Sequence, residues 1–293
     1  MYVDPWSSTQ PVNVKNNSRR SCCFGCGSVI AIAVGLILVI GLIGLLPGRT
    51  NVLVIGIDRA PEGTSLGRSD TIILATFVPI NPYVGMLSIP RDLWVTIPGI
   101  GENRINTAHF FAESEMAGQG PQATMETVRY NFGIDVNYFI RVNFEGLKEI
   151  VDAMGGLELE LENATGGYSP GKHKLKGDQA LAFVRDREGT DDFFRMERGQ
   201  LFIKSVLIQS LKPATWLRLP AMAPAILRAI DTNLPVWQLP RMAVSILITG
   251  TDNIDNRVIT RDMVHPTTTA GGAQVLIPDW PKINPVLLEM FGQ

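Results

Sequence analysis

The chain has 293 residues, of which 45% are hydrophobic and 18% are charged, and its formal net charge is −2. This charge gives no sign of nucleic-acid affinity, and neither zinc-finger spacing nor an aromatic–basic RNA motif is present. Once a membrane segment is set aside, about 250 residues remain, which is enough for one large domain or two small ones.

The first 50 residues predict a membrane anchor. Residues 28–46, SVIAIAVGLILVIGLIGLL, are 19 residues without a charge, just enough to cross a hydrocarbon core. Three basic residues and a single acid precede this run, so the positive-inside rule places residues 1–27, which we expect to be disordered, in the cytoplasm. We favour an uncleaved anchor over a cleaved signal peptide, because the run is long for a signal peptide and lacks an A-x-A-like site. All three cysteines precede the anchor, in SCCFGCG, so the outer region has no disulfide or thiol chemistry.

After the anchor, strand and helix patterns alternate. Short Val- and Ile-rich runs predict buried strands at 51–57, 71–77 and 83–89. The later patterns predict, in order, a helical region from about 106 to 132, a strand at 136–142, a helix at 144–156, a strand at 157–162, helices at 174–187, 193–211, 220–231 and 235–249, an edge strand within GAQVLIPDW, and a final short helix. This alternation predicts an α/β sandwich with one core and a central sheet covered on both faces.

Common catalytic motifs are absent. The sequence has no H-E-x-x-H, G-x-S-x-G, P-loop or G-x-G-x-x-G motif, so zinc sites and ordinary hydrolytic triads are unsupported. The three histidines, His109, His173 and His265, are scattered, and we expect each to have a surface or structural role.

Arginine and aspartate instead gather at the ends of predicted strands. Asp58 and Arg59 follow the first strand, Arg68 and Asp70 precede the second, and Arg91 follows the third. The crevice at the carboxyl ends of strands is the usual ligand site of open α/β sheets, and an antiparallel first hairpin would bring the two aspartates together. Two carboxylates beside several guanidinium groups suit a divalent cation and a polyphosphate. A plain salt-bridge network is the alternative, and it is the commoner explanation for any single pair.

A second arginine-rich stretch is FVRDREGTDDFFRMERGQ, residues 183–200. Arg185 and Arg187 would share one face of an extended segment, and Arg195 and Arg198 would share one face of a helix. A solvated charged face with local acidic partners is the alternative, and the pattern alone does not separate the two.

Six stretches in order carry a resemblance to a known family. They are NVLVIGIDR (51–59), GRSDTIIL (67–74), MLSIPRDLWV (86–95), RINTAHFF (104–111), LKGDQALAFVRDR (175–187) and DDFFRMERGQ (191–200). Together with the N-terminal anchor, they resemble the LytR-CpsA-Psr family of cell-wall glycopolymer ligases over roughly residues 50–212.

The resemblance implies a phosphotransferase outside the membrane that moves a glycan from a polyprenyl-pyrophosphate carrier to peptidoglycan. The implied fold is an α/β/α sandwich around a central mixed sheet, with an apolar tunnel for the lipid and one transmembrane helix before it. Asp58 and Asp70 would hold Mg²⁺ (or Mn²⁺), and Asp192 would act as the base, with Arg195 and Arg198 beside it. The arginines implied in gripping the pyrophosphate are Arg59, Arg68, Arg91, Arg185, Arg187 and Arg195. The implied partners are the lipid-linked glycan, peptidoglycan and the membrane, without nucleic acid.

One position departs from the family pattern. The family usually has glutamine directly after the second arginine of the helix motif, whereas this chain has Gly199 followed by Gln200. Either the contact is missing or Gln200 supplies it. Two alternatives to the transferase therefore stay open: a hydrolase of the lipid pyrophosphate, and a membrane-anchored lipid-binding or regulatory protein without turnover. Gly199 favours the regulatory alternative, and the presence of both Asp58 and Asp70 argues against it.

Overall fold

The computed structural model describes residues 48–58, 66–186 and 192–292, together with the four positions 31, 35, 39 and 42. The chain from Ile43 to Gln293 forms one compact unit. Most of the predicted anchor lies outside the described residues. Among the helices that are described, none is both long and apolar enough to cross a membrane.

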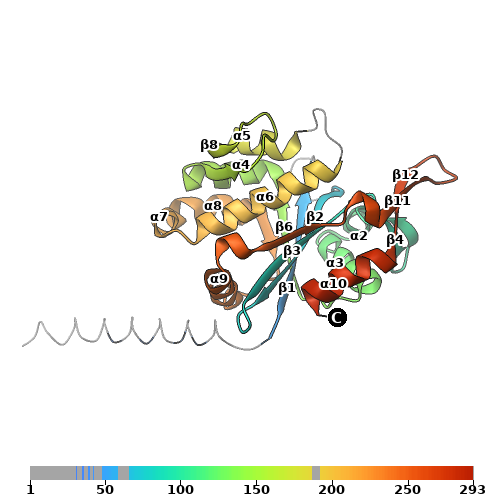
Figure 1. The fold of residues 1–293 in the computed structure, drawn as a ribbon, viewed down its shortest axis with the longest axis horizontal. Coiled ribbons are helices and arrows are strands. Elements are labelled where there is room, and N and C mark those ends of the chain that lie inside the picture. Colours follow the sequence, from blue (N-terminus) through green and yellow to red (C-terminus); the bar gives the residue numbers. More distant parts are fainter. Residues whose placement is uncertain are drawn as a thin grey trace, which may run out of the picture. The chain divides into compact units, whose positions relative to one another are not determined.

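A mixed sheet lies at the centre of the described domain (Figure 1). Its order is β10-β3-β2-β1-β6-β9. The strands are β1 (Thr50–Ile57), β2 (Ser69–Val78), β3 (Tyr83–Ile89), β6 (Tyr138–Asn143), β9 (Ile230–Thr232) and β10 (Asp255–Val258). β1 pairs antiparallel with β2 and parallel with β6, while β3 pairs antiparallel with β2 and parallel with β10. The predicted mixed α/β architecture is confirmed.

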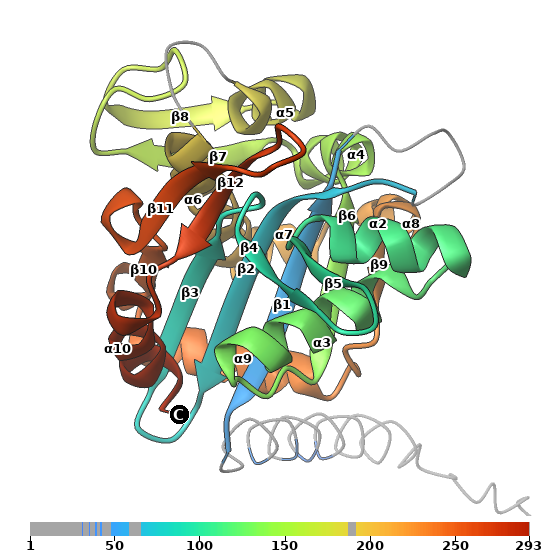
Figure 2. The ribbon, with the colours of Figure 1, turned by 90° about the vertical axis from the view of Figure 1, so that its right-hand side faces the viewer.

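Helices cover both faces of this sheet because its central strands are apolar on both sides. One face of β1, with Leu53, Ile55 and Ile57, packs in a cluster with α3 and α10, and the other face, with Val52 and Val54, packs with α6 and α9. Figure 2 shows α2 and α3 in front of the sheet. The first layer contains α2 (Thr107–Glu115), α3 (Gly120–Phe132) and α10 (Trp280–Phe291). The second contains α4 (Phe144–Met154), α5 (Gly177–Arg185), α6 (Asp192–Ser210), α7 (Pro213–Trp216), α8 (Leu219–Ala229) and α9 (Gln238–Thr249).

Three two-stranded hairpins lie outside the central sheet in the described residues: β4 (Trp94–Ile97) with β5 (Gly101–Arg104), β7 (Leu157–Leu161) with β8 (Gly171–Leu175), and β11 (Val264–Thr268) with β12 (Gln274–Pro278). The sequence predicts β7 and β12 but not their partners. The helical region expected at 106–132 is two helices rather than one. The chain turns between them at Gly118, whose φ of 89° lies in the left-handed region that favours glycine.

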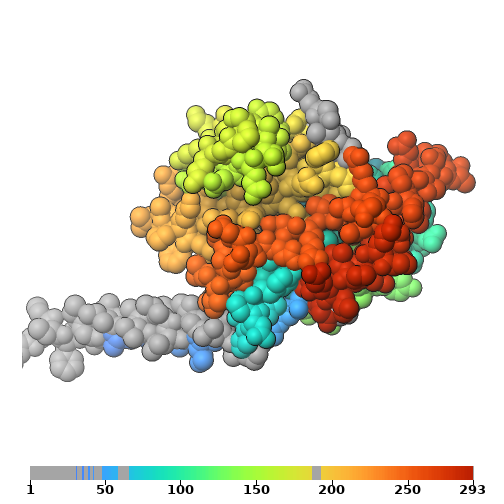
Figure 3. Space-filling model, viewed as in Figure 1, coloured from blue at the N-terminus to red at the C-terminus, as the bar shows by residue number. Residues whose placement is uncertain are grey.

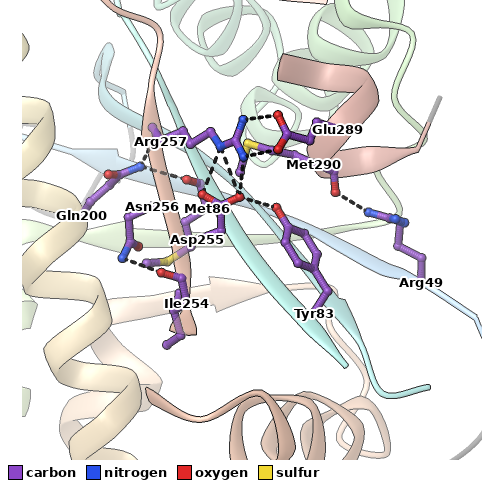
Figure 4. A network of polar contacts seen from close by, with 10 residues as sticks. All are labelled: Arg49, Tyr83, Met86, Gln200, Ile254, Asp255, Asn256, Arg257, Glu289 and Met290. Atoms are coloured by element: carbon purple, nitrogen blue, oxygen red, sulfur yellow. Dashed lines mark hydrogen bonds and ion pairs between the residues drawn. The ribbon is translucent and has the colours of Figure 1, made fainter. Parts of the chain in front are cut away.

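The C-terminal residues 213–293 complete the same domain. β10 forms the sheet edge beside β3, and Arg257 on it donates hydrogen bonds to Asp255 and to Glu289 of α10 (Figure 4). These hydrogen bonds to Glu289 and Asp255 raise the pKa of Arg257. The Tyr83 hydroxyl donates to Asp255 at 2.8 Å, and burial together with this bond raises the pKa of Tyr83. A polar network therefore joins the edge strands to α10.

Candidate active site

Three strand ends meet at one edge of the sheet. β1 and β3 both run antiparallel to β2, so their carboxyl ends lie beside the start of β2. Asp58 follows β1, Arg91 lies just beyond β3, and Asp70 lies near the start of β2. The predicted antiparallel hairpin, which brings the two aspartates to one end, is confirmed.

Asp70 occupies an irregular position in this hairpin. Gly56 pairs with Thr71 and Ile57 pairs with Ser69, which leaves Asp70 as the extra residue of a β-bulge. A bulge bends its strand and re-aims the side chains beside it, and bulges are common next to active sites. The bulge therefore explains how the side chain of Asp70 is directed toward the end of the sheet where β1 and β3 finish.

Arginine side chains engage both aspartates. Arg185, the last residue of α5, donates from Nε and Nη2 to Oδ1 of Asp58, at 3.0 and 2.5 Å, and from Nη2 to Glu145 at 2.8 Å. Arg91 donates to Oδ1 of Asp70 at 2.6 Å. Burial alone lowers the pKa of Arg185, but its hydrogen bonds to Glu145 and Asp58 outweigh burial and raise that pKa. The guanidinium group of Arg185 is therefore held, charged, at this end of the sheet.

A pocket opens between these groups. It contains about 310 Å³ of empty space, part of it open to solvent, and is lined by Asp58, Asp70, Thr71, Phe144, Val184, Arg185 and Arg195. Arg195, in the first turn of α6, also donates from Nη2 to the backbone carbonyl of Asp70 at 3.2 Å. Acids and guanidinium groups over an apolar wall suit a phosphorylated group whose charge must be neutralised.

The apolar wall depends on a close approach between β1 and α4. A Cβ on Gly56 would lie 2.6 Å from the ring of Phe144, which is closer than real side chains come. Glycine at this position therefore lets the first residue of α4 pack against the strand, under the pocket. Sequence reasoning missed Thr71, Phe144 and Val184, since neither helix nor strand patterns mark a side chain as facing a pocket.

The remaining predicted residues have different surroundings. Arg68 is exposed and does not line the pocket. Arg198 is buried, with 2% of its side chain exposed, and donates to the backbone carbonyl of Asp186 beyond α5. Arg195 and Arg198, expected on one helix face, thus reach different groups. Arg59 and Arg187 lie outside the described residues, as does the side chain of Asp192, which begins α6. The catalytic roles of these residues stay predictions.

A buried polar network holds the residues just before β2 in place. His109 of α2 donates from Nδ1 to the carbonyl of Gly67 at 2.9 Å, and its Nε2 lies 3.4 Å from Nη1 of Arg141. Burial is the main cause that lowers the pKa of His109. Arg141 also pairs with Glu113 at 3.0 Å; burial opposes ionisation of Glu113, but backbone hydrogen bonds and Arg141 lower its pKa overall. The network fixes the residues just before Asp70, which makes the role of His109 structural.

The unusual glycine of α6 faces the pocket wall. A Cβ on Gly199 would meet only Cγ2 of Thr71, at 3.9 Å, so a side chain has room there. Gln200 is buried and donates to the carbonyls of Met86, at 3.0 Å, and Arg257 (Figure 4). Its amide is therefore engaged by β3 and β10, and it does not line the pocket. Of the two alternatives for the family's glutamine contact, this arrangement favours the one in which the contact is missing.

Comparison with known proteins identifies relatives of the whole domain. A model of the LytR_cpsA_psr family matches residues 46–290. TagU of Oceanobacillus iheyensis, a polyisoprenyl-teichoic acid–peptidoglycan teichoic acid transferase, is 32% identical over 248 residues, which cover 83% of this chain and 75% of TagU. Regulatory protein MsrR of Staphylococcus aureus is 27% identical over 220 residues, 72% of this chain and 64% of MsrR. This chain thus spans just under two thirds of the length of MsrR.

The fold has solved counterparts. The crystal structure of TagV from B. subtilis matches with a TM-score of 0.67 at 23% identity, covering 84% of this chain and 98% of TagV. At this identity, the similarity concerns the fold alone. The family model spans most of the chain, and TagU is more than 30% identical over most of its length. This chain therefore belongs to the LytR-CpsA-Psr family.

Proposed function

We propose that this chain transfers a teichoic-acid-type glycopolymer from a polyisoprenyl-pyrophosphate carrier to peptidoglycan. The similarity to TagU supports the substrate class. In the reaction, an acceptor hydroxyl oxygen attacks the phosphorus that bears the glycan, the P–O bond to the lipid phosphate breaks, and a phosphodiester forms. The hydroxyl proton passes to a base, for which Asp192 is the candidate.

One observation carries the proposal: Arg185 and Arg195 line one pocket with Asp58 and Asp70. Phosphoryl transfer needs mainly positioning and neutralisation of charge, and a guanidinium group supplies both because it binds phosphate oxygens in a bidentate manner. Arg185 is oriented by Asp58, whose side chain is only 7% exposed, and Arg91 is held beside Asp70. These acids therefore pre-position the arginines for a pyrophosphate.

The donor set also suits a divalent cation. No group of three or more candidate ligand residues occurs within the described part of the chain, but Asp58 and Asp70 face the same pocket. Mg²⁺ commonly takes one or two carboxylates and completes its shell with water and substrate phosphate. We propose that these two aspartates hold Mg²⁺ or Mn²⁺, which would neutralise charge on the pyrophosphate.

We further propose that residues 28–46 anchor the chain in the membrane, with the domain on the outer side. Their hydropathy and the basic residues before them support this placement. A lipid-linked donor and a wall acceptor are both available only at that surface.

The test uses the full chain in vesicles with a polyprenyl-pyrophosphate-linked teichoic acid precursor and a peptidoglycan acceptor. We would follow release of polyprenyl phosphate and formation of linked product, in wild type, Asp70→Asn and Asp178→Asn. Loss of one electrostatic group from such a site lowers the rate by on the order of 10²–10³, so Asp70→Asn should lose transfer. Asp178 is the matched control, since it is 77% exposed and pairs with Lys148 away from the pocket.

The outcomes separate the alternatives. Linked product that disappears in Asp70→Asn and on chelation, and returns with Mg²⁺ or Mn²⁺, supports the transferase. Polyprenyl phosphate without linked product would identify the hydrolase. Lipid binding without release under any condition would identify the non-catalytic alternative and contradict the proposal.

A further inference from the structure

Helix α9 is apolar on both faces. Its inner face, with Met242 and Ile246, packs on the sheet. Val236 and Trp237 in the turn before the helix, and Leu239, Leu247 and Ile248 on it, are each more than half exposed; we call these five residues the α9 surface. An all-round apolar helix is typical of a buried position, and contiguous exposed apolar residues mark interaction sites. We therefore expect a binding partner to cover the α9 surface.

The short connection between α9 and the proposed anchor indicates that this partner is the membrane. Arg241 of α9 donates to the backbone carbonyl of Gly48, and the hydroxyl of Thr50 donates to Gln238 at 3.2 Å. The apolar run of the proposed anchor ends at Leu46, so Pro47 alone separates it from a residue bonded to α9. Two residues span at most about 8 Å, given the spacing of consecutive Cα atoms. A membrane that holds the anchor therefore lies next to α9.

Charge and composition along the neighbouring stretch agree with this occupant. Residues 212–249 contain four basic residues (Lys212, Arg218, Arg228 and Arg241) and one acid (Asp231). Lys212 and Arg228 form ion pairs with Glu158 and Glu149, whereas Arg218 and Arg241 form none among the described residues and supply the positive charge of this surface. The same stretch exposes Trp216, Leu217, Leu219 and Leu227 on α7 and α8. Tryptophan and leucine combined with arginine are typical of protein surfaces that lie in the interface of anionic membranes.

These elements also lie on one side of the domain. α9 packs on the sheet face that α6 covers, and α8 packs on α4 in the same layer. Figure 1 shows α7, α8 and α9 on the left, away from α3 and α10, and Figure 3 shows their residues, in gold and orange, at the molecular surface. Both groups of exposed apolar residues therefore belong to the same layer of the domain.

We propose that the α9 surface docks into the interface of an anionic phospholipid bilayer, with the exposed residues of α7 and α8 extending the contact. This inference rests on the proposed anchor and is independent of the proposed reaction. β1 then leads from the membrane end, at Thr50, to the pocket at Asp58, a length of eight residues or about 27 Å at the usual strand rise. Docking thus fixes how the pocket is oriented above the membrane.

The test measures tryptophan fluorescence of the full chain in vesicles of phosphatidylglycerol and phosphatidylcholine whose acyl chains carry bromine, which quenches nearby indoles. We expect Trp237→Phe and Trp216→Phe to remove most of the lipid-dependent quenching that the domain contributes. Trp94→Phe is the matched control, since Trp94 lies on the β4 hairpin against the other face of the sheet, and it should leave that quenching unchanged. Trp6 and Trp280 are present in every variant and give a constant background.

A second pair of variants tests the apolar contact itself. Leu247→Ser should reduce quenching of Trp237, whereas Leu288→Ser, at a similarly exposed leucine on α10, should not. Unchanged quenching in both tryptophan variants would overturn the proposal. So would cross-linking of α9 to α9 between two copies without quenching, because a second copy would then cover the surface. Transfer activity is measured separately, so failed docking is distinguishable from a failed function.

Discussion

Replacing Gly199 by alanine should stabilise the protein. Gly199 lies inside α6, where glycine costs about 1 kcal/mol relative to alanine. The added Cβ would meet Thr71 at ordinary van der Waals distance, 3.9 Å, and nothing else within 4 Å. Because the site is buried, the methyl group adds up to about 0.8 kcal/mol from its own removal from water. The expected gain in the free energy of unfolding is therefore about 1–2 kcal/mol.

Gly146 in α4 provides the matched control with the opposite sign. A Cβ there would lie 2.4 Å from Cβ of Ala229 and 2.8 Å from its Cα, so α4 and α8 would have to move apart. Overpacking of this kind costs about 1–3 kcal/mol, which exceeds the gain in helix propensity. The same substitution in two helices should thus shift stability in opposite directions, solely because of the space beside each Cα.

Thermal unfolding of the full chain in detergent, followed by circular dichroism, measures both variants. In a domain of this size, 1 kcal/mol corresponds to about 2–4 °C, so Gly199→Ala should raise the Tm by a few degrees and Gly146→Ala should lower it. A fall in Tm for Gly199→Ala comparable to that of Gly146→Ala would refute the reasoning, since it would mean that the space beside Thr71 is already filled.

Asp58→Asn should lower transfer at least about 100-fold, whereas Glu145→Gln, at the exposed partner of the same arginine, should change it little, as measured by linked product. Gln200→Ala removes the hydrogen bonds from this side chain to one buried and one partly buried carbonyl and should cost about 1–3 kcal/mol in urea unfolding, while the exposed Gln122→Ala should cost little. Burial lowers the pKa of His109 in the folded state, so the folded protein binds a proton there less readily than the unfolded chain does. The free energy of unfolding should therefore be unaffected by His109 above about pH 6.5 and should fall below that pH, by up to about 1.4 kcal/mol per pH unit. Unfolding titrations from pH 7.5 to 5.5 measure this slope, which His109→Gln should flatten.

The sequence predicted the central strands because their apolar runs are continuous. Residues 51–57, 71–77 and 83–89 are buried on both faces, and such runs are readable without tertiary information. The meeting of Asp58 and Asp70 also follows from chain geometry, since a hairpin returns to its starting edge. In contrast, β10 has the sequence DNRV, and it is a strand only because β3 offers it an edge. The hydrophobic pattern of residues 255–258 therefore does not predict that they pair with β3.

Details of the site depend on partners that are distant in the sequence. Arg185 reaches Asp58 across 127 positions, and Arg141 reaches His109 across 32. The arginine-rich stretch that holds Arg185 is compatible with a solvated face as well as a site, and only the packing of α5 decides between them. The bulge at Asp70 could not be predicted from alternation either, because it lies at the second residue of β2, before the apolar run of that strand begins.

The charges of the pocket indicate why a cation and a pyrophosphate would bind together. Arg91 and Arg185 form ion pairs with Asp70 and Asp58, Arg185 also pairs with Glu145, and Arg195 lines the same pocket. A cation alone would compete with two guanidinium groups for the same carboxylates, and a pyrophosphate alone would compete with the carboxylates for the same guanidinium groups. If the proposed cation and pyrophosphate bound together, phosphate oxygens would pair with the arginines and the aspartates would bind the cation, so that no buried charge would lack an opposite one. Under this proposal each ligand would favour binding of the other, and by linkage the coupling would be equal in both directions. The proposed function therefore predicts that the cation strengthens pyrophosphate binding by the same factor as the pyrophosphate strengthens cation binding.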